Sequence, residues 1–145
     1  MKQSGRASLM TIAAIVAVLL VVGLMFLGKE SVTSVGDRFL KALYFGDVET
    51  LTKMSYLGND TEDQMRKKWD FAVNRAGKYY LFAYRITGGK QVSDDTAQVT
   101  MQFIKDAANP GSYEEKYEIP LVKVGNDWKV DVKGMNRTIY PALPR

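Results

Sequence analysis

The chain opens with an apolar run that differs from everything after it. The nineteen residues from Leu9 to Leu27 carry no charge, and as a helix they reach about 28 Å, close to the hydrocarbon thickness of a bilayer. The run is longer than the apolar core of a cleaved signal peptide, and it ends without a convincing small-x-small cleavage site. The pattern therefore predicts one uncleaved transmembrane helix over residues 9–27.

The charges that flank this run predict its orientation. Lys2 and Arg6 precede it without acidic neighbours, whereas Lys29 and Glu30 follow it and cancel each other. By the positive-inside rule, the N-terminus is expected in the cytoplasm. We therefore expect a single-pass, signal-anchored protein of the inner (cytoplasmic) membrane. Residues 1–8 would be cytoplasmic, and the rest of the chain would be periplasmic or extracellular.

Two short helices are expected next. Apolar residues recur at spacings of three and four from Val32 to Leu43, which is typical of a helix with one buried stripe, and Gly46 can end it. Asp47 is a suitable N-cap for a second helix that extends to Met54. Both helices should bury one side only.

A third helix is predicted between Thr61 and Gly77. Thr61 with Gln64 three residues later forms a capping box, and acidic residues follow in the first turn. Gly77 closes the pattern. The apolar stripe of this helix comprises Met65, Trp69, Ala72, Val73 and Ala76.

After Gly77 the apolar spacing changes to two, which indicates strands. A turn is expected at residues 87–89, and a hairpin turn at residues 125–127. A change of phase near Pro120 indicates a bulge or an edge position. The four predicted strands are Tyr80–Ile86, Ala97–Phe103, Tyr113–Leu121 and Trp128–Val132.

Helices followed by a run of strands predict an α+β domain with helices packed on an antiparallel sheet. We place this domain at residues 28–134, with about three helices and about four strands, and an extended C-terminal tail at residues 135–145. The sequence shows no repeat and no second core.

Composition excludes several classes of chemistry. The chain has neither cysteine nor histidine, so disulfides, a lipoprotein anchor, common zinc sites and histidine-based triads or dyads are all ruled out. The net charge is +4, and the basic cluster Arg66-Lys67-Lys68 lies among acidic residues. A solvated helix face is the favoured interpretation, and no nucleic-acid partner, metal or cofactor is expected.

Three motifs resemble the nuclear transport factor 2-like superfamily, which has a cystatin-like fold. They are Phe39-Leu40-x-Ala42-Leu43-x-x-Gly46-Asp47, Asp94-Asp95-x-Ala97-x-Val99 and Trp128-Lys129-Val130. Together with the apolar N-terminus they resemble small bacterial, membrane-anchored members of unknown function. The resemblance covers about Val32 to Val132 and implies a curved sheet wrapped around a long helix, with a cone-shaped pocket.

Such a pocket is used for catalysis by some members of the superfamily and for binding or packing by many. Asp70 with one of Tyr79, Tyr80 or Tyr84 is the least implausible acid-base pair, but nothing in the sequence indicates a raised carboxyl pKa. Core packing is the favoured interpretation of most of the aromatic side chains. The residues that the resemblance suggests for the pocket lining are Trp69, Phe71, Tyr80, Phe82, Phe103 and Trp128.

We expect a non-catalytic accessory or scaffolding subunit of a larger membrane complex, in contact with lipid and other subunits. Ala13 and Ala17 form a small-x-x-x-small pair that permits close helix approach. Tyr140, Pro141 and Pro144 lie in a stiff tail that suits contact with a partner, and a frayed terminus is the alternative. The competing function is a membrane-anchored module that binds a small apolar ligand in the cone.

Overall fold

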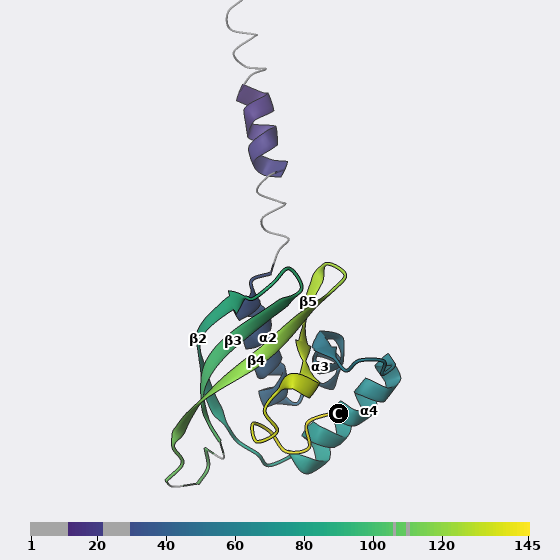
Figure 1. Cartoon of the computed structure of the whole chain (residues 1–145), viewed down its shortest axis with the longest axis vertical. Coiled ribbons are helices and arrows are strands. Elements are labelled where there is room, and N and C mark those ends of the chain that lie inside the picture. The colour runs from purple at the N-terminus through teal and green to yellow at the C-terminus, as the bar shows by residue number, and fades with distance from the viewer. Residues whose placement is uncertain (1–11, 22–29, 106, 110) are drawn as a thin grey trace, which may run out of the picture. The chain divides into compact units, whose positions relative to one another are not determined.

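The structure, a computed structural model, describes residues 12–21, 30–105, 107–109 and 111–145 (Figure 1). The chain divides into two units, Met1–Glu30 and Ser31–Arg145. The described residues of the second unit form three α-helices and a five-stranded sheet, which agrees with the predicted α+β class.

The predicted membrane span is not found among the described residues. Residues 12–21 form a helix with exposed side chains, Ala13 and Ala17 among them. In the described part of the chain, no helix combines the length and the hydropathy that a crossing requires. The prediction of a single-pass inner-membrane protein with a periplasmic domain is therefore wrong. Residues 9–11 and 22–27 of the predicted span lie outside the described residues.

Helix α2 (Val32–Phe45) forms where the apolar spacing predicts it. The main-chain N–H of Ser34 donates to Ser31 Oγ at 3.2 Å and so caps the helix start. Gly46 ends the helix with a φ of 68°, a left-handed conformation that glycine adopts without strain. The side chains that α2 buries are Val35, Phe39, Leu40, Ala42 and Leu43.

The next two helices also begin at their predicted caps. Asp47 accepts from the Thr50 N–H at 3.1 Å at the start of α3 (Val48–Met54). Thr61 and Gln64 form the expected capping box at the start of α4 (Glu62–Phe71). These contacts satisfy main-chain N–H groups that a helix start leaves without partners.

A π-helical turn extends α4 as far as the predicted stop. Residues Ala72–Ala76 form this turn (η1), and the Gly77 N–H donates to the Ala72 carbonyl at 2.7 Å. Ala72 and Val73 are buried in this turn, whereas Ala76, which was expected in the buried stripe, is exposed. Such turns are rare in proteins, and those that occur are often found at functional sites.

The sheet has the order β1-β5-β4-β3-β2, and its neighbours are antiparallel except for β1 and β5, which are parallel. Figure 1 shows the strands crossing in front of α2, while α3 and α4 lie on the side of β5. The strands are β1 (Ser55–Tyr56), β2 (Ala83–Gln91), β3 (Thr96–Ile104), β4 (Glu114–Val124) and β5 (Asp127–Asp131).

Two strand predictions need correction. β2 begins at Ala83 rather than Tyr80 and continues through Gly88 and Gly89, where a turn was expected. A register shift after Ile86 accommodates these residues. A Cβ on Gly89 would approach Thr33 Cγ2 to 2.7 Å, so the glycine permits close packing against the start of α2.

No bulge occurs at Pro120. It pairs with Gln98 in an unbroken β3–β4 register and lies one residue beyond the β4–β5 ladder, which starts at Leu121. Pro120 therefore has a local edge position, where a missing N–H is tolerated. Sequence patterns did not predict β1, because its two residues directly follow α3.

The C-terminal segment belongs to the core of the second unit. Residues 135–145 contain turns but neither a helix nor a strand, and a short 3₁₀ turn, η2 (Val132–Gly134), precedes them. Ile139, Tyr140 and Leu143 are buried. The Tyr140 hydroxyl donates to the Gly77 carbonyl at 3.3 Å, so the segment is fixed to the end of α4 and η1.

Candidate functional site

The aromatic residues suggested for a cone-shaped pocket lie mostly in packed surroundings. Trp69 and Phe103 are fully buried, Phe82 is nearly so, and Tyr80 and Trp128 are half-buried. Phe82 stacks on Phe103 with a centroid distance of 4.9 Å. Phe71 differs from the others because 51% of it is exposed. The pocket remains a prediction, and these contacts are those of a core.

The interior is also poor in polar chemistry. Among the described residues, the buried polar side chains outside the tyrosines are Thr52 and Ser55. Each donates to a carbonyl of α3, Thr52 to Val48 at 2.7 Å and Ser55 to Leu51 at 2.6 Å. Ser55 also accepts from the Trp69 indole N–H at 2.9 Å. These hydroxyl groups satisfy local main-chain and indole partners.

In the structure, the residues considered as an acid-base pair form hydrogen bonds with other partners. Asp70 is exposed and accepts from Asn74 at 2.8 Å, and Tyr79 is 84% exposed. Tyr80 donates to the Ile139 carbonyl at 3.2 Å. Tyr84 donates to Asp37 Oδ1 at 3.0 Å instead. Sequence patterns missed Asp37 because it sits on α2, 47 residues away from its partner.

Asp37 and Tyr84 border an open groove of about 430 Å³ between α2 and β2. A hydrogen bond from Lys41 holds the pKa of Asp37 below its usual value. Burial, with the neighbouring Asp37, raises the pKa of Tyr84 to about 12. At neutral pH the carboxylate is a weakened base and the phenol a weakened acid. The hydrogen bond of the pair links β2 to α2.

A second polar cluster lies where β3 ends and β4 begins. Lys105 pairs with Glu115 at 3.1 Å, and Tyr117 donates to the same carboxylate. The hydrogen bond from Tyr117 is the main cause that lowers the pKa of Glu115. Hydrogen bonding with Tyr117 likewise raises the pKa of Lys105. Both shifts move the pKa of the group further from the neutral pH range. This makes Glu115 a weaker base and Lys105 a weaker acid, which disfavours proton transfer.

Two adjoining grooves lie along the exposed side of α4, and we call them the α4 grooves. One, of about 470 Å³, is lined by Val48, Arg66, Lys67, Asp70, Phe71 and Arg75. The other, of about 400 Å³, shares Lys67 and Phe71 and is completed by Lys68 and residues 142–145. Half-exposed Phe71 stands between them. This surface combines an aromatic side chain with several cations.

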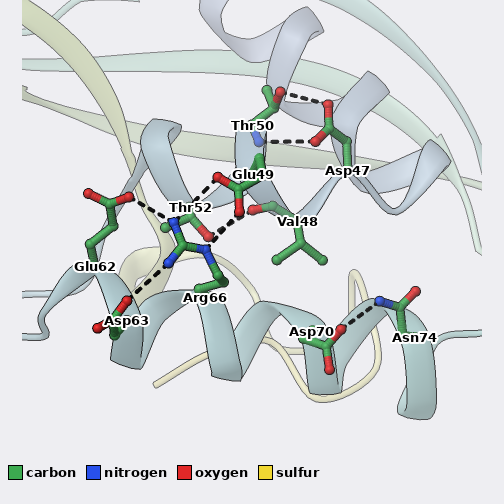
Figure 2. A network of polar contacts seen from close by, with 10 residues as sticks. All are labelled: Asp47, Val48, Glu49, Thr50, Thr52, Glu62, Asp63, Arg66, Asp70 and Asn74. Atoms are coloured by element: carbon green, nitrogen blue, oxygen red, sulfur yellow. Dashed lines mark hydrogen bonds and ion pairs between the residues drawn. The ribbon is translucent and has the colours of Figure 1, made fainter.

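Arg66 joins α3 to α4 at one end of these grooves (Figure 2). Its guanidinium contacts Glu49 Oε1 at 2.7 Å, Glu62 Oε1 at 3.0 Å and Asp63 Oδ1 at 3.0 Å. The hydrogen bond from Arg66 lowers the pKa of Glu49. In Figure 2, Val48 lies between this network and the Asp70–Asn74 pair. The network compensates the charge of Arg66.

Lys68 links α4 to the C-terminal segment. Its Nζ atom lies 2.5 Å from Asp60 Oδ2 and 2.5 Å from the main-chain oxygen of Arg145. The Arg145 side chain in turn donates to the carbonyls of Val132 at 3.3 Å and Met135 at 3.2 Å. Residues 142–145 are thereby held beside α4, where Figure 1 places the C-terminus.

The tail residues expected to contact a partner have different exposures. Tyr140 and Pro144 are buried, and Pro141 is half-buried. Ala142 between them is exposed and has a φ of 51°, which is unusual for a residue other than glycine. The segment therefore forms a turn that is fixed by its buried residues. Contact with a partner remains a prediction.

The described residues contain no group of three or more acidic side chains placed to hold a metal ion. The three carboxylates near Arg66 surround a guanidinium instead.

Comparisons with known proteins bear on the fold. No protein-family model matches the sequence, and no curated protein is significantly similar to it. Among solved structures, a ketosteroid isomerase-like protein from Erwinia carotovora atroseptica SCRI1043 is 16% identical, with a TM-score of 0.46. That match covers 67% of this chain and 85% of the other.

A second solved structure is an NTF-2 like protein of unknown function from Shewanella oneidensis MR-1. It is 12% identical to this chain, with a TM-score of 0.44, and the match covers 66% of this chain and 88% of the other. The likeness concerns the backbone arrangement alone, and no catalytic or binding residue is transferred from either protein.

Proposed function

We propose that the unit Ser31–Arg145 is a non-catalytic accessory or scaffolding module that acts by binding another protein. The supporting observation is the contrast between its interior and its surface. The buried side chains are apolar apart from Thr52, Ser55 and the tyrosines, and no buried Asp, Glu, Lys or Arg occurs among the described residues. Chemistry by general acids and bases needs such groups beside a cavity.

The polar pair that borders the groove between α2 and β2 supports the same function. The carboxylate of Asp37 and the phenol of Tyr84 have pKa values displaced from neutrality in the directions that weaken both as catalysts. The grooves beside α4 are open surfaces with an aromatic centre and a charged border, which is the composition of protein-contact sites.

A small-ligand module is the alternative. It requires a cavity lined by Trp69, Phe82, Phe103 and their neighbours, and these rings pack against one another. These three side chains line neither the groove between α2 and β2 nor the α4 grooves. An apolar ligand would have to displace packed side chains, which costs stability.

The test is the native mass of the full chain. A tagged full-length chain is expressed in its own cells, extracted gently and measured by native gel and native mass spectrometry. We expect an assembly well above 16.3 kDa that contains a different polypeptide. A species at the chain's own mass, or one built only from its own copies, would overturn the proposal. A bound organic molecule on the monomer would favour the ligand module.

A further inference from the structure

We propose that the α4 grooves dock an acidic segment of a partner protein, which places an apolar side chain against Phe71. This inference rests on the proposed function, because it names the surface and the chemistry of the partner. It begins with one residue. Phe71 is 51% exposed, whereas Trp69, two positions earlier on the same helix, is fully buried. A half-exposed aromatic side chain between two grooves is a natural anchor site for a partner.

The second observation is the sign of the charge. Taken together, the two grooves are lined by one acidic side chain, Asp70, against five basic ones. This excess favours a partner of opposite charge. The basic lining residues are Arg66, Lys67, Lys68, Arg75 and Arg145.

The third observation separates compensated cations from available ones. Arg66 is paired with Glu49, Glu62 and Asp63, and Lys68 with Asp60. Lys67 and Arg75 are exposed and form no ion pair within the described residues. They lie four positions before and four positions after Phe71. With one available cation on each side of the aromatic ring, the surface suits a peptide segment in which carboxylates flank an apolar side chain.

The site is also held in place before a partner arrives. The Lys68 contacts with Asp60 and with the Arg145 main chain fix the C-terminal turn, and buried Leu143 anchors it beside α4. A preformed groove avoids part of the entropy cost of binding.

The same features disfavour a nucleic acid as the occupant. A phosphate backbone needs a continuous basic surface, whereas Glu62 and Asp63 lie next to the basic cluster on α4. The apolar lining by Val48, Leu143 and Pro144 also fits a side chain better than a phosphate.

The test uses the full chain in its own cells. Phe71→p-benzoylphenylalanine puts a photo-reactive aromatic group at the centre of the grooves, and Tyr79→p-benzoylphenylalanine, at an 84% exposed aromatic position, is the matched control. We expect residue 71 to cross-link to one protein, at a segment rich in Asp or Glu with a large apolar residue. A cross-link to a basic segment or to nucleic acid, or equal capture from both positions, would overturn the inference.

Charge reversal provides the second arm. The double variant Lys67→Glu, Arg75→Glu in the photo-reactive chain should lower the yield of the cross-link at residue 71 about tenfold, because it reverses both available cations. Lys116→Glu, an exposed position on β4, should leave the yield unchanged. Raising the salt concentration should weaken the wild-type cross-link as well. An unchanged yield in the double variant and at high salt would overturn the charge argument.

These outcomes are distinguishable from failure of the proposed function. A large native assembly without a cross-link from residue 71 would leave the accessory role standing and remove the α4 grooves as its surface. A chain that migrates at its own mass and gives no cross-link would remove both.

Discussion

Helix α4 carries two aromatic residues, Trp69 and Phe71, that lie in contrasting regions of the molecule. Trp69 belongs to the packed interior, and Phe71 belongs to the grooved surface. Trp69 is fully buried, contacts Phe39 edge to face at a centroid distance of 5.8 Å, and donates its N–H to Ser55. Phe71 is half-exposed between two grooves with a basic border. A change of two positions rotates a side chain by about 200° around a helix. The same residue class therefore stabilises the fold at one position and offers a contact surface at the other.

The largest expected effect tests the interior. Trp69→Ala should lower the free energy of unfolding by about 3–5 kcal/mol, because it leaves a cavity and removes the hydrogen bond to Ser55. Phe71→Ala should cost under about 1 kcal/mol, because half of that side chain is already in water. Urea unfolding of the full chain, followed by far-UV circular dichroism, measures both. Equal losses would contradict the division between the two regions.

The next prediction tests the packing of the C-terminal segment against the rest of the core. A Cβ on Gly77 would overlap the phenol ring of Tyr140, so Gly77→Ala should destabilise the fold by about 1–3 kcal/mol. Gly88→Ala is the matched control, since no atom lies within 4 Å of its Cβ position. Thermal melts of both variants measure the difference. A neutral Gly77→Ala would show that Tyr140 is not held against Gly77 in solution.

A smaller effect is expected where α2 meets β2. Tyr84→Phe removes the hydrogen bond to Asp37 and should cost about 1 kcal/mol. The pKa of Tyr84 rises from 10 to about 12 on folding, so its contribution is fully present below pH 10. It is lost as the pH rises toward 12. The stability gap between wild type and Tyr84→Phe should be constant from neutrality to pH 10 and shrink above it, as measured by urea unfolding at each pH.

The smallest effect concerns the surface network at the end of the α4 grooves. Arg66→Gln should return the pKa of the Glu49 carboxyl toward its ordinary 4.5, because the hydrogen bond from Arg66 is the main cause of the lowering. Since that pKa is depressed on folding, its contribution to stability is present above 4.5 and is lost as the pH falls through the folded value. Carboxyl-carbon NMR titration measures the shift. Lys53→Gln, a minor cause, should move the pKa less.

Much of the fold was readable from local patterns. The Asp47 cap and the Thr61–Gln64 capping box depend on residues three positions apart, and both form. The alternating burial of β3 was likewise visible in its sequence. The turn expected at Gly88 and Gly89 was wrong, because glycine also permits close approach, and the neighbour that needs it is Thr33 on a distant helix.

The candidate site was less accessible to sequence patterns. The cluster Arg66-Lys67-Lys68 was interpreted as a solvated face with opposite charges nearby, and two of its three cations are indeed paired. Lys67 remains available because of which carboxylates the fold brings close to the cluster. The fold also places Lys67 in one groove with Phe71 and Arg75.

The sequence by itself determined the elements whose signals are local: helix starts and ends, strand periodicity, and the absence of cysteine and histidine chemistry. Tertiary structure decided the rest. The parallel pairing of β1 with β5, the Asp37–Tyr84 contact and the seating of residues 142–145 beside Phe71 all join residues far apart in the chain. Such contacts depend on loop closure and on packing across elements, which local propensity does not encode.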